Sequence, residues 1–149
     1  YQHIKKNDIP TIDEGNDVLL KVLVGKIKNI SSAVQTYSPV SIFDVQFAKP
    51  SLIDLDIPKN QTAMVYVIDG ELKFHEDKQI AKKGQMIYFD QSSDMINLTS
   101  ISPNGSYLVL AGEPLNEPVV RYGPFVTNTE GDMKQAMLDY QNGKMGTLS

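Results

Sequence analysis

Cysteine is absent from this 149-residue chain, which excludes disulfide bonds, thiolate catalysis and cysteine-ligated zinc. Only two histidines, His3 and His75, are present, so a site that needs three imidazoles cannot form. A basic surplus is also lacking, because 14 Lys and Arg residues stand against 18 Asp and Glu residues. The longest uninterrupted apolar run, Ala63–Ile68, is far too short to cross a bilayer. We therefore expect neither a nucleic-acid partner nor a membrane association.

A signal peptide is not visible at the start of the chain, since no charged segment followed by an apolar one is found there. The chain opens on Tyr1 rather than on methionine, which predicts a piece of a longer protein. The lack of a visible signal peptide and the lack of cysteine together favour a cytoplasmic location.

Short stretches in which apolar and polar residues alternate cover most of the chain, and a period of two is typical of strands. Turn-forming residues separate these stretches at regular intervals, which favours an all-β sandwich or closed barrel. Asp69-Gly70 predicts a hairpin with a type I′ turn between its two neighbouring strands. The expected strands are Val18–Val24, Ile27–Ile30, Ser41–Phe47, Ser51–Ile57, Ala63–Ile68, Glu71–His75, Met86–Phe89, Asp94–Thr99 and Ser106–Ala111.

The last part of the chain has a different pattern. Gly112–Asn128 holds three of the eight prolines and predicts an extended arm. Thr129 is a typical helix N-cap, and apolar residues follow from Met133 to Tyr140 at helical spacing. Gly143 is typical of the residue just after a helix end. The sequence therefore predicts one C-terminal helix.

The arm and the helix together resemble the signature of the pirin family, from Gly112-Glu113-Pro114-Leu115-Asn116-Glu117-Pro118 through Arg121-Tyr122-Gly123-Pro124-Phe125 to Asn128-Thr129. The hairpin segment Val65–Glu71 and the opening Tyr1-Gln2 extend the resemblance over nearly the whole chain. Pirins are bicupins, with two jelly-roll cupin barrels in one chain. The resemblance implies an interdomain linker remnant (1–12), a single antiparallel jelly-roll cupin barrel (13–111), and an arm with one C-terminal helix (112–149). This would be the second barrel alone.

A metal-binding cupin carries two motifs, G-x5-H-x-H-x3–4-E-x6-G and G-x5-P-x-G-x2-H-x3-N, which place three imidazoles and one carboxylate around a cation such as iron. Aligned on Gly70 and Gly84, the four ligand positions hold Asp56, Pro58, Ala63 and Met95. With the shorter gap the histidine pair falls on Ile57 and Lys59 instead. We therefore expect a degenerate barrel without a catalytic residue, a metal or another cofactor.

The resemblance implies that the metal, usually iron, is held by the N-terminal barrel. That barrel would carry a quercetin dioxygenase-like or a redox-regulatory activity of the parent protein, and it is the expected partner of this chain. Two alternatives stay open: a metal-free small-molecule-binding barrel, or an interaction module that self-associates or binds a regulatory protein.

Two groups of residues are candidates for these roles. An apolar cavity could be lined by inward-facing residues, although small closed barrels usually have filled cores. Its candidate residues are Ala63, Val65, Val67, Met95, Asn97 and Thr99. Domain docking is expected at the second apolar face of one strand and at the arm, because apolar faces need cover. Those residues are Met64, Tyr66, Ile68, Arg121, Tyr122, Gly123, Pro124, Phe125 and Asn128.

Other residues invite a functional interpretation but fit a surface role better. Asp54 and Asp56 alternate with apolar neighbours, and such carboxylates usually point to solvent. His75 shares a face with Glu71 and Lys73, which also predicts a solvent-facing side chain. The basic clusters lack interleaved aromatic residues and are expected to be solvated; they are Lys5-Lys6, Lys26 with Lys28, and Lys82-Lys83.

Overall fold

The computed structural model describes residues 2–74, 79–89 and 95–146. The strands of the first part are β1 (Thr11–Gly15), β2 (Val18–Val24), β3 (Lys26–Ile27), β4 (Ile30–Ser31), β5 (Val40–Phe47), β6 (Ser51–Asp56), β7 (Thr62–Asp69), β8 (Glu71–Phe74), β9 (Gln79–Lys82), β10 (Met86–Phe89), β11 (Met95–Ser100) and β12 (Gly105–Gly112). They are followed by β13 (Val120–Tyr122), β14 (Phe125–Thr127) and the helix α1 (Glu130–Gln141), while a 3-10 turn, η1 (Lys6–Asp8), precedes them all. The all-β prediction with one C-terminal helix is confirmed.

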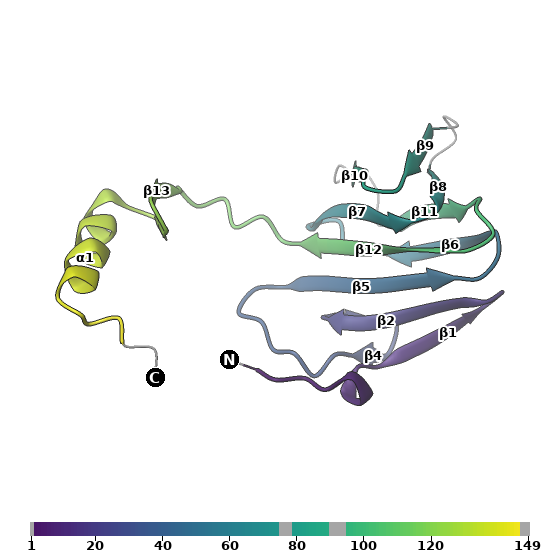
Figure 1. Cartoon of the computed structure of the whole chain (residues 1–149), viewed down its shortest axis with the longest axis horizontal. Helices are drawn as coiled ribbons and strands as arrows, with labels where there is room; N and C mark the ends of the chain where they lie inside the picture. Colours follow the sequence, from purple (N-terminus) through teal and green to yellow (C-terminus); the bar gives the residue numbers. More distant parts are fainter. Residues whose placement is uncertain (1, 75–78, 90–94, 147–149) are drawn as a thin grey trace. The chain divides into compact units, whose positions relative to one another are not determined.

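Two antiparallel sheets build the first of two compact units, residues 1–114. One sheet has the strand order β1-β2-β5-β12-β7-β10 and the other has the order β6-β11-β8-β9. Figure 1 shows β5, β12 and β7 side by side in the middle of the larger sheet. Among the described residues, β10 pairs with β7 alone and is an edge strand. No helix in the described ranges is long and apolar enough to span a bilayer.

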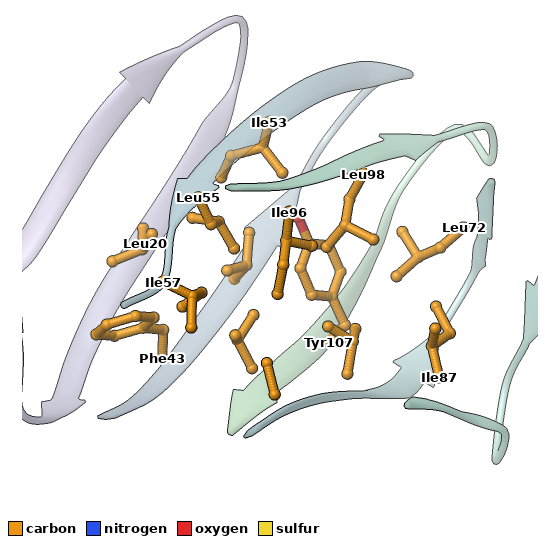
Figure 2. Close-up of a cluster of buried hydrophobic side chains, with 14 of the residues drawn as sticks. Leu20, Phe43, Ile53, Leu55, Ile57, Leu72, Ile87, Ile96, Leu98 and Tyr107 are labelled. Carbon is orange, nitrogen blue, oxygen red and sulfur yellow. The ribbon is translucent and has the colours of Figure 1, made fainter. Parts of the chain in front are cut away.

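The core lies between these two sheets and follows the predicted period of two. Along β5, Phe43, Val45 and Phe47 are buried, as predicted, while the residues between them are half-buried. Along β6, Ile53 and Leu55 are buried and alternate with exposed residues. Figure 2 shows side chains of both sheets, among them Leu20, Leu98 and Tyr107, interleaved in one cluster. The same alternation thus specifies both layers.

The predicted hairpin at Asp69-Gly70 is wrong. β7 pairs with β12 and β10, whereas β8 pairs with β11 and β9, so the chain crosses from one sheet to the other at Gly70. A type I′ turn needs a positive φ at both central residues, and of the two only Gly70 has one, at 85°. A Cβ on Gly70 would lie 2.9 Å from the Asn104 carbonyl oxygen and 3.1 Å from Phe47 Cζ. Glycine is therefore required at a crowded corner of the sandwich.

The strand predicted over Ile27–Ile30 is also wrong, because this segment folds back on itself. β3 pairs with β4 in a small antiparallel ladder in which Ile27 lies opposite Ile30. Lys28, between the two strands, has a φ of 52°, which an extended strand does not allow.

Residues 115–149 form the second compact unit, with the strand pair β13–β14 and the helix α1. The predicted N-cap is confirmed, since the Thr129 side chain accepts a hydrogen bond from the Asp132 backbone N–H at 3.1 Å. Gly143 has a φ of 69°, as a residue after a helix end should. The arm was expected to be extended throughout, but Val120–Tyr122 and Phe125–Thr127 pair as a hairpin. The ring of Phe125 contacts that of Tyr140 edge-on at 5.7 Å.

A substitution at the corner glycine tests the crowding there. We expect Gly70→Ala to lower the free energy of unfolding by about 2–4 kcal/mol, through left-handed strain together with overpacking. Gly84→Ala is the matched control, because Gly84 has a φ of 81° with nothing within 4 Å of the added Cβ. It should cost only about 1–2 kcal/mol. Urea unfolding measures both, and equal losses would contradict the crowded corner.

The buried Tyr107 predicts alkaline sensitivity. Burial raises the pKa of the Tyr107 hydroxyl far above the ordinary tyrosine value. The unfolded chain releases this proton near pH ~10 while the folded chain keeps it, so its contribution to stability is complete below that pH and declines above it, by up to about 1.4 kcal/mol per pH unit. We expect Tyr107→Phe to remove this decline, and Tyr37→Phe, at a fully exposed residue, to retain it. Urea midpoints across alkaline pH test this, and an identical decline in Tyr107→Phe would contradict it.

Candidate functional site

An open groove of about 670 Å³ lies in the first unit, where β6 ends and β5 and β7 begin. Its lining residues come from three segments of the chain and none is aromatic. They are Gly25, Lys26, Ile27, Lys28, Thr36, Pro39, Val40, Ser41, Asp56, Ile57, Pro58 and Gln61. We call this the β6-end groove.

The floor and the rim of the β6-end groove differ in character. Ile27, Ser41, Ile57 and Gln61 are buried and form the floor. The charged side chains are exposed and lie at the rim. Lys28 forms an ion pair with Glu14, and no salt bridge links Lys26 or Asp56 to another described residue. The groove thus combines a mixed apolar and polar floor with charges of both signs at its entrance.

Only some of the four positions at which a metal-binding cupin carries its ligands lie at this groove. Asp56 and Pro58 line it, whereas Ala63 points into the core with 3% of its surface exposed. Met95 lies opposite Asp56 in the β6–β11 ladder but is 44% exposed. Within the described ranges no three His, Asp or Glu side chains lie close enough to hold a metal ion. The residues present therefore do not fit a cupin metal.

The predicted cavity residues do not line one space. Val65 and Val67 are fully buried in the filled core beside Ala63. Met95 and Asn97 point the other way, because Ile96 and Leu98 take the inward positions of β11. The inward orientation expected for Met95 is therefore wrong: counting along the motif from Gly84 placed β11 one residue out of phase, and one residue exchanges the two faces of a strand.

The outward face of β11 is polar instead. The Asn97 side-chain amide donates a hydrogen bond to Asp54 Oδ1 at 2.6 Å, across the ladder from β6. Thr99 is half-buried on the same face. Asp54 and Asp56 are exposed, which confirms that these carboxylates face solvent. A paired-carboxylate site enclosed by protein is not formed.

An apolar surface, separate from the β6-end groove, lies on the outer side of the larger sheet. Tyr66 is 37% exposed and lies between Met86 on β10 and Leu108 on β12. Tyr88, which lies opposite Met64, is 67% exposed. We call this surface the outer apolar face; it comprises Met64, Tyr66, Ile68, Met86, Tyr88, Leu108 and Leu110. It bears out the expectation that β7 is apolar on both sides.

The arm residues expected to dock a neighbouring domain lie in the second unit. Arg121 and Tyr122 are exposed on β13, and Gly123-Pro124 turns the chain into β14, where Phe125 is half-buried. The Asn128 side-chain amide holds the arm together, donating to Glu117 Oε2 at 2.8 Å and to the Pro118 carbonyl at 3.0 Å. These contacts build the arm locally, and its docking role stays a prediction.

The remaining candidates lie at the surface or outside the described residues. Lys26, Lys28 and the basic pairs Lys5-Lys6 and Lys82-Lys83 are exposed, which confirms the prediction that the basic clusters are solvated. His3 is also exposed. His75 lies outside the described residues. Gln61 is not among the predicted site residues, although the inward series Ala63, Val65 and Val67, continued backwards by two, indicates it.

Comparison with known proteins identifies the relatives of this fold. The model of the Pirin C-terminal cupin domain family matches residues 42–146. Pirin of Mus musculus is 34% identical over 98% of this chain and 51% of its own length, and Pirin-1 of Arabidopsis thaliana is 34% identical over 98% and 52%. The crystal structure of quercetin 2,3-dioxygenase from Acinetobacter baumannii superposes with a TM-score of 0.90 at 29% identity, over 100% of this chain and 51% of that one. The chain thus spans about half the length of the relatives it matches.

The vacated ligand positions predict weak metal binding. We expect iron, nickel, copper or manganese to bind at far less than one ion per chain after dialysis, because Asp56 alone keeps a ligand-capable side chain there. Elemental analysis measures the stoichiometry. Asp56→Asn and His75→Ala should leave it unchanged. About one tightly held ion per chain, lost in either variant, would contradict this prediction.

Proposed function

The chain belongs to the pirin family, and we propose that it is the non-catalytic, metal-free second barrel of a bicupin. In this role it completes the protein and covers a first barrel that carries the metal-dependent chemistry. The observation that carries the proposal is the content of the ligand positions. Pro58 and Ala63 carry no ligand, Asp56 is exposed, and Met95, the residue that the motif count reaches, points away from the core.

The filled interior supports the same role. A metal-dependent dioxygenase needs open coordination positions in a cavity that substrate can enter. Here Val65, Val67 and Tyr107 fill the space between the sheets, with 0%, 0% and 2% of their surfaces exposed. Substrate chemistry is therefore assigned to the half of the parent protein that precedes this domain.

The outer apolar face supports docking against that half. Exposed apolar side chains of β7 and β10 lie beside half-buried ones of β12 on one side of the sheet, and contiguous apolar patches typically mark interfaces. The relatives extend over about twice the length of this chain, which supplies a second domain as the occupant. The parent protein would then carry a quercetin dioxygenase-like activity, as the name of its Acinetobacter relative suggests, or the redox-regulatory activity that the pirin resemblance implies.

A binding experiment tests the docking surface. We expect this chain to associate with the separately produced first half of the parent protein, and Tyr66→Lys to weaken the complex at least tenfold, because a charge would be buried in an apolar contact. Tyr37→Lys, at a fully exposed residue outside the outer apolar face, is the control. Calorimetric titration measures both. Equal affinities for the two variants would exclude this face as the docking surface.

An activity assay separates this role from the alternatives. With iron and quercetin present we expect no turnover by the chain alone, and turnover from the first half with or without it. Turnover by this chain that a chelator abolishes would overturn the non-catalytic role. Self-association that Tyr66→Lys abolishes, without binding to the first half, would favour an interaction module instead.

A further inference from the structure

The floor of the β6-end groove holds a buried amide whose oxygen lacks a hydrogen-bond partner among the described residues. Gln61 is 7% exposed and lines the groove, and its side-chain oxygen Oε1 accepts no hydrogen bond from any described residue. Its backbone N–H is satisfied separately by the Pro58 carbonyl at 2.8 Å. Buried polar side-chain atoms in native proteins nearly always have a partner. The Gln61 side chain is therefore suited to a partner from outside the chain.

The strand register places the smallest inward side chains at the end of the core that is nearest to the groove. Ser41, Ala111 and Ala63 lie opposite one another on β5, β12 and β7 and form an inward row of small side chains. The next inward row, Phe43, Val109 and Val65, is larger. Ser41 belongs to the small row and lines the groove beside Gln61. Small side chains on three neighbouring strands thus lie at the end of the core where Ser41 meets the groove.

Gly25 allows the backbone on one side of the groove to lie against β5. A Cβ on Gly25 would lie 2.4 Å from the Val40 carbonyl oxygen and 3.0 Å from Ser41 Oγ. The backbone before β3 can therefore lie directly against β5 only without a side chain. This contact brings Lys26 and Ile27 to the groove that Ser41 lines from the other side.

The charges of the groove do not select a charged ligand. Asp56 and Lys26 have opposite signs, and the Lys28 cation is already paired with Glu14. The polar floor groups, an amide and a hydroxyl, each offer both a donor and an acceptor. A ligand that satisfies both needs groups of the same dual kind, such as hydroxyls.

The apolar lining is aliphatic. Ile27 and Ile57 lie in the floor, Pro39 and Pro58 lie at the rim, and none of the described lining residues carries an aromatic ring for stacking. Aliphatic walls suit the C–H surface of a saturated molecule better than a flat aromatic ring. We propose that the β6-end groove binds a small, neutral, polyhydroxylated aliphatic molecule of the polyol or monosaccharide class, with the Gln61 amide and the Ser41 hydroxyl as hydrogen-bond partners. This site is independent of the role proposed above.

Amide NMR on the full chain tests the site directly. We expect titration with myo-inositol or glucose to shift the Gln61 side-chain amide resonance saturably, while catechol, an aromatic diol, binds more weakly. Gln61→Leu keeps the volume and removes the amide, and Ser41→Ala removes the hydroxyl. Each should weaken binding about tenfold, the equivalent of about 1.4 kcal/mol. Gln79→Leu, on exposed β9 away from the groove, is the matched control and should leave the affinity unchanged.

Three results would overturn the proposal. One is the absence of a saturable shift with either polyol, which would leave ordered water as the only partner of the amide. Another is tighter binding of catechol than of both polyols. The third is an equal loss of affinity in Gln61→Leu and Gln79→Leu, which would place the bound polyol elsewhere. If Gln61→Leu does not fold, the amide shift in the unmodified chain and the Ser41→Ala affinity still decide between these results.

Discussion

The register of three adjacent strands, β5, β12 and β7, is the constraint on which the rest of the molecule depends. Val45, Tyr107 and Val67 lie opposite one another, as do Phe43, Val109 and Val65 in the next row. These rows are buried and receive the side chains of the smaller sheet, which Figure 2 shows for Leu98 and Ile96. A slip of one residue in any of the three strands would turn its apolar row to solvent. Core, groove and outer apolar face therefore all follow from one alignment.

Much of this fold could be predicted because alternation is a local property. Phe43, Val45 and Phe47 could be assigned to the core from their spacing alone, and Thr129 to a helix N-cap from its neighbours. The failures have a different origin. Asp69-Gly70 has the composition of a hairpin turn, but residues distant in the sequence determine which strands pair. The residues that crowd Gly70, Asn104 and Phe47, are also distant in the sequence. Pairing is a tertiary property.

The candidate site shows the same division between local and distant information. The loss of ligand-capable residues at Pro58 and Ala63 could be predicted by counting along a motif. The orientation of Met95 could not, since one residue more or less in the preceding segment reverses it. The β6-end groove is assembled from segments around Lys26, Ser41 and Gln61 that no spacing rule connects. A site made of loop ends is found only once the strands are in place.

The edge strand β10 has a consequence for how such a protein is made. Its residues Met86–Phe89 are all apolar, and among the described residues only β7 pairs with them. An apolar edge of this kind is a template on which a strand of another molecule can add. A tethered neighbour is present at a far higher effective concentration than any stray chain. A covering segment carried on the same polypeptide would therefore shield this edge more effectively than a separate chain could.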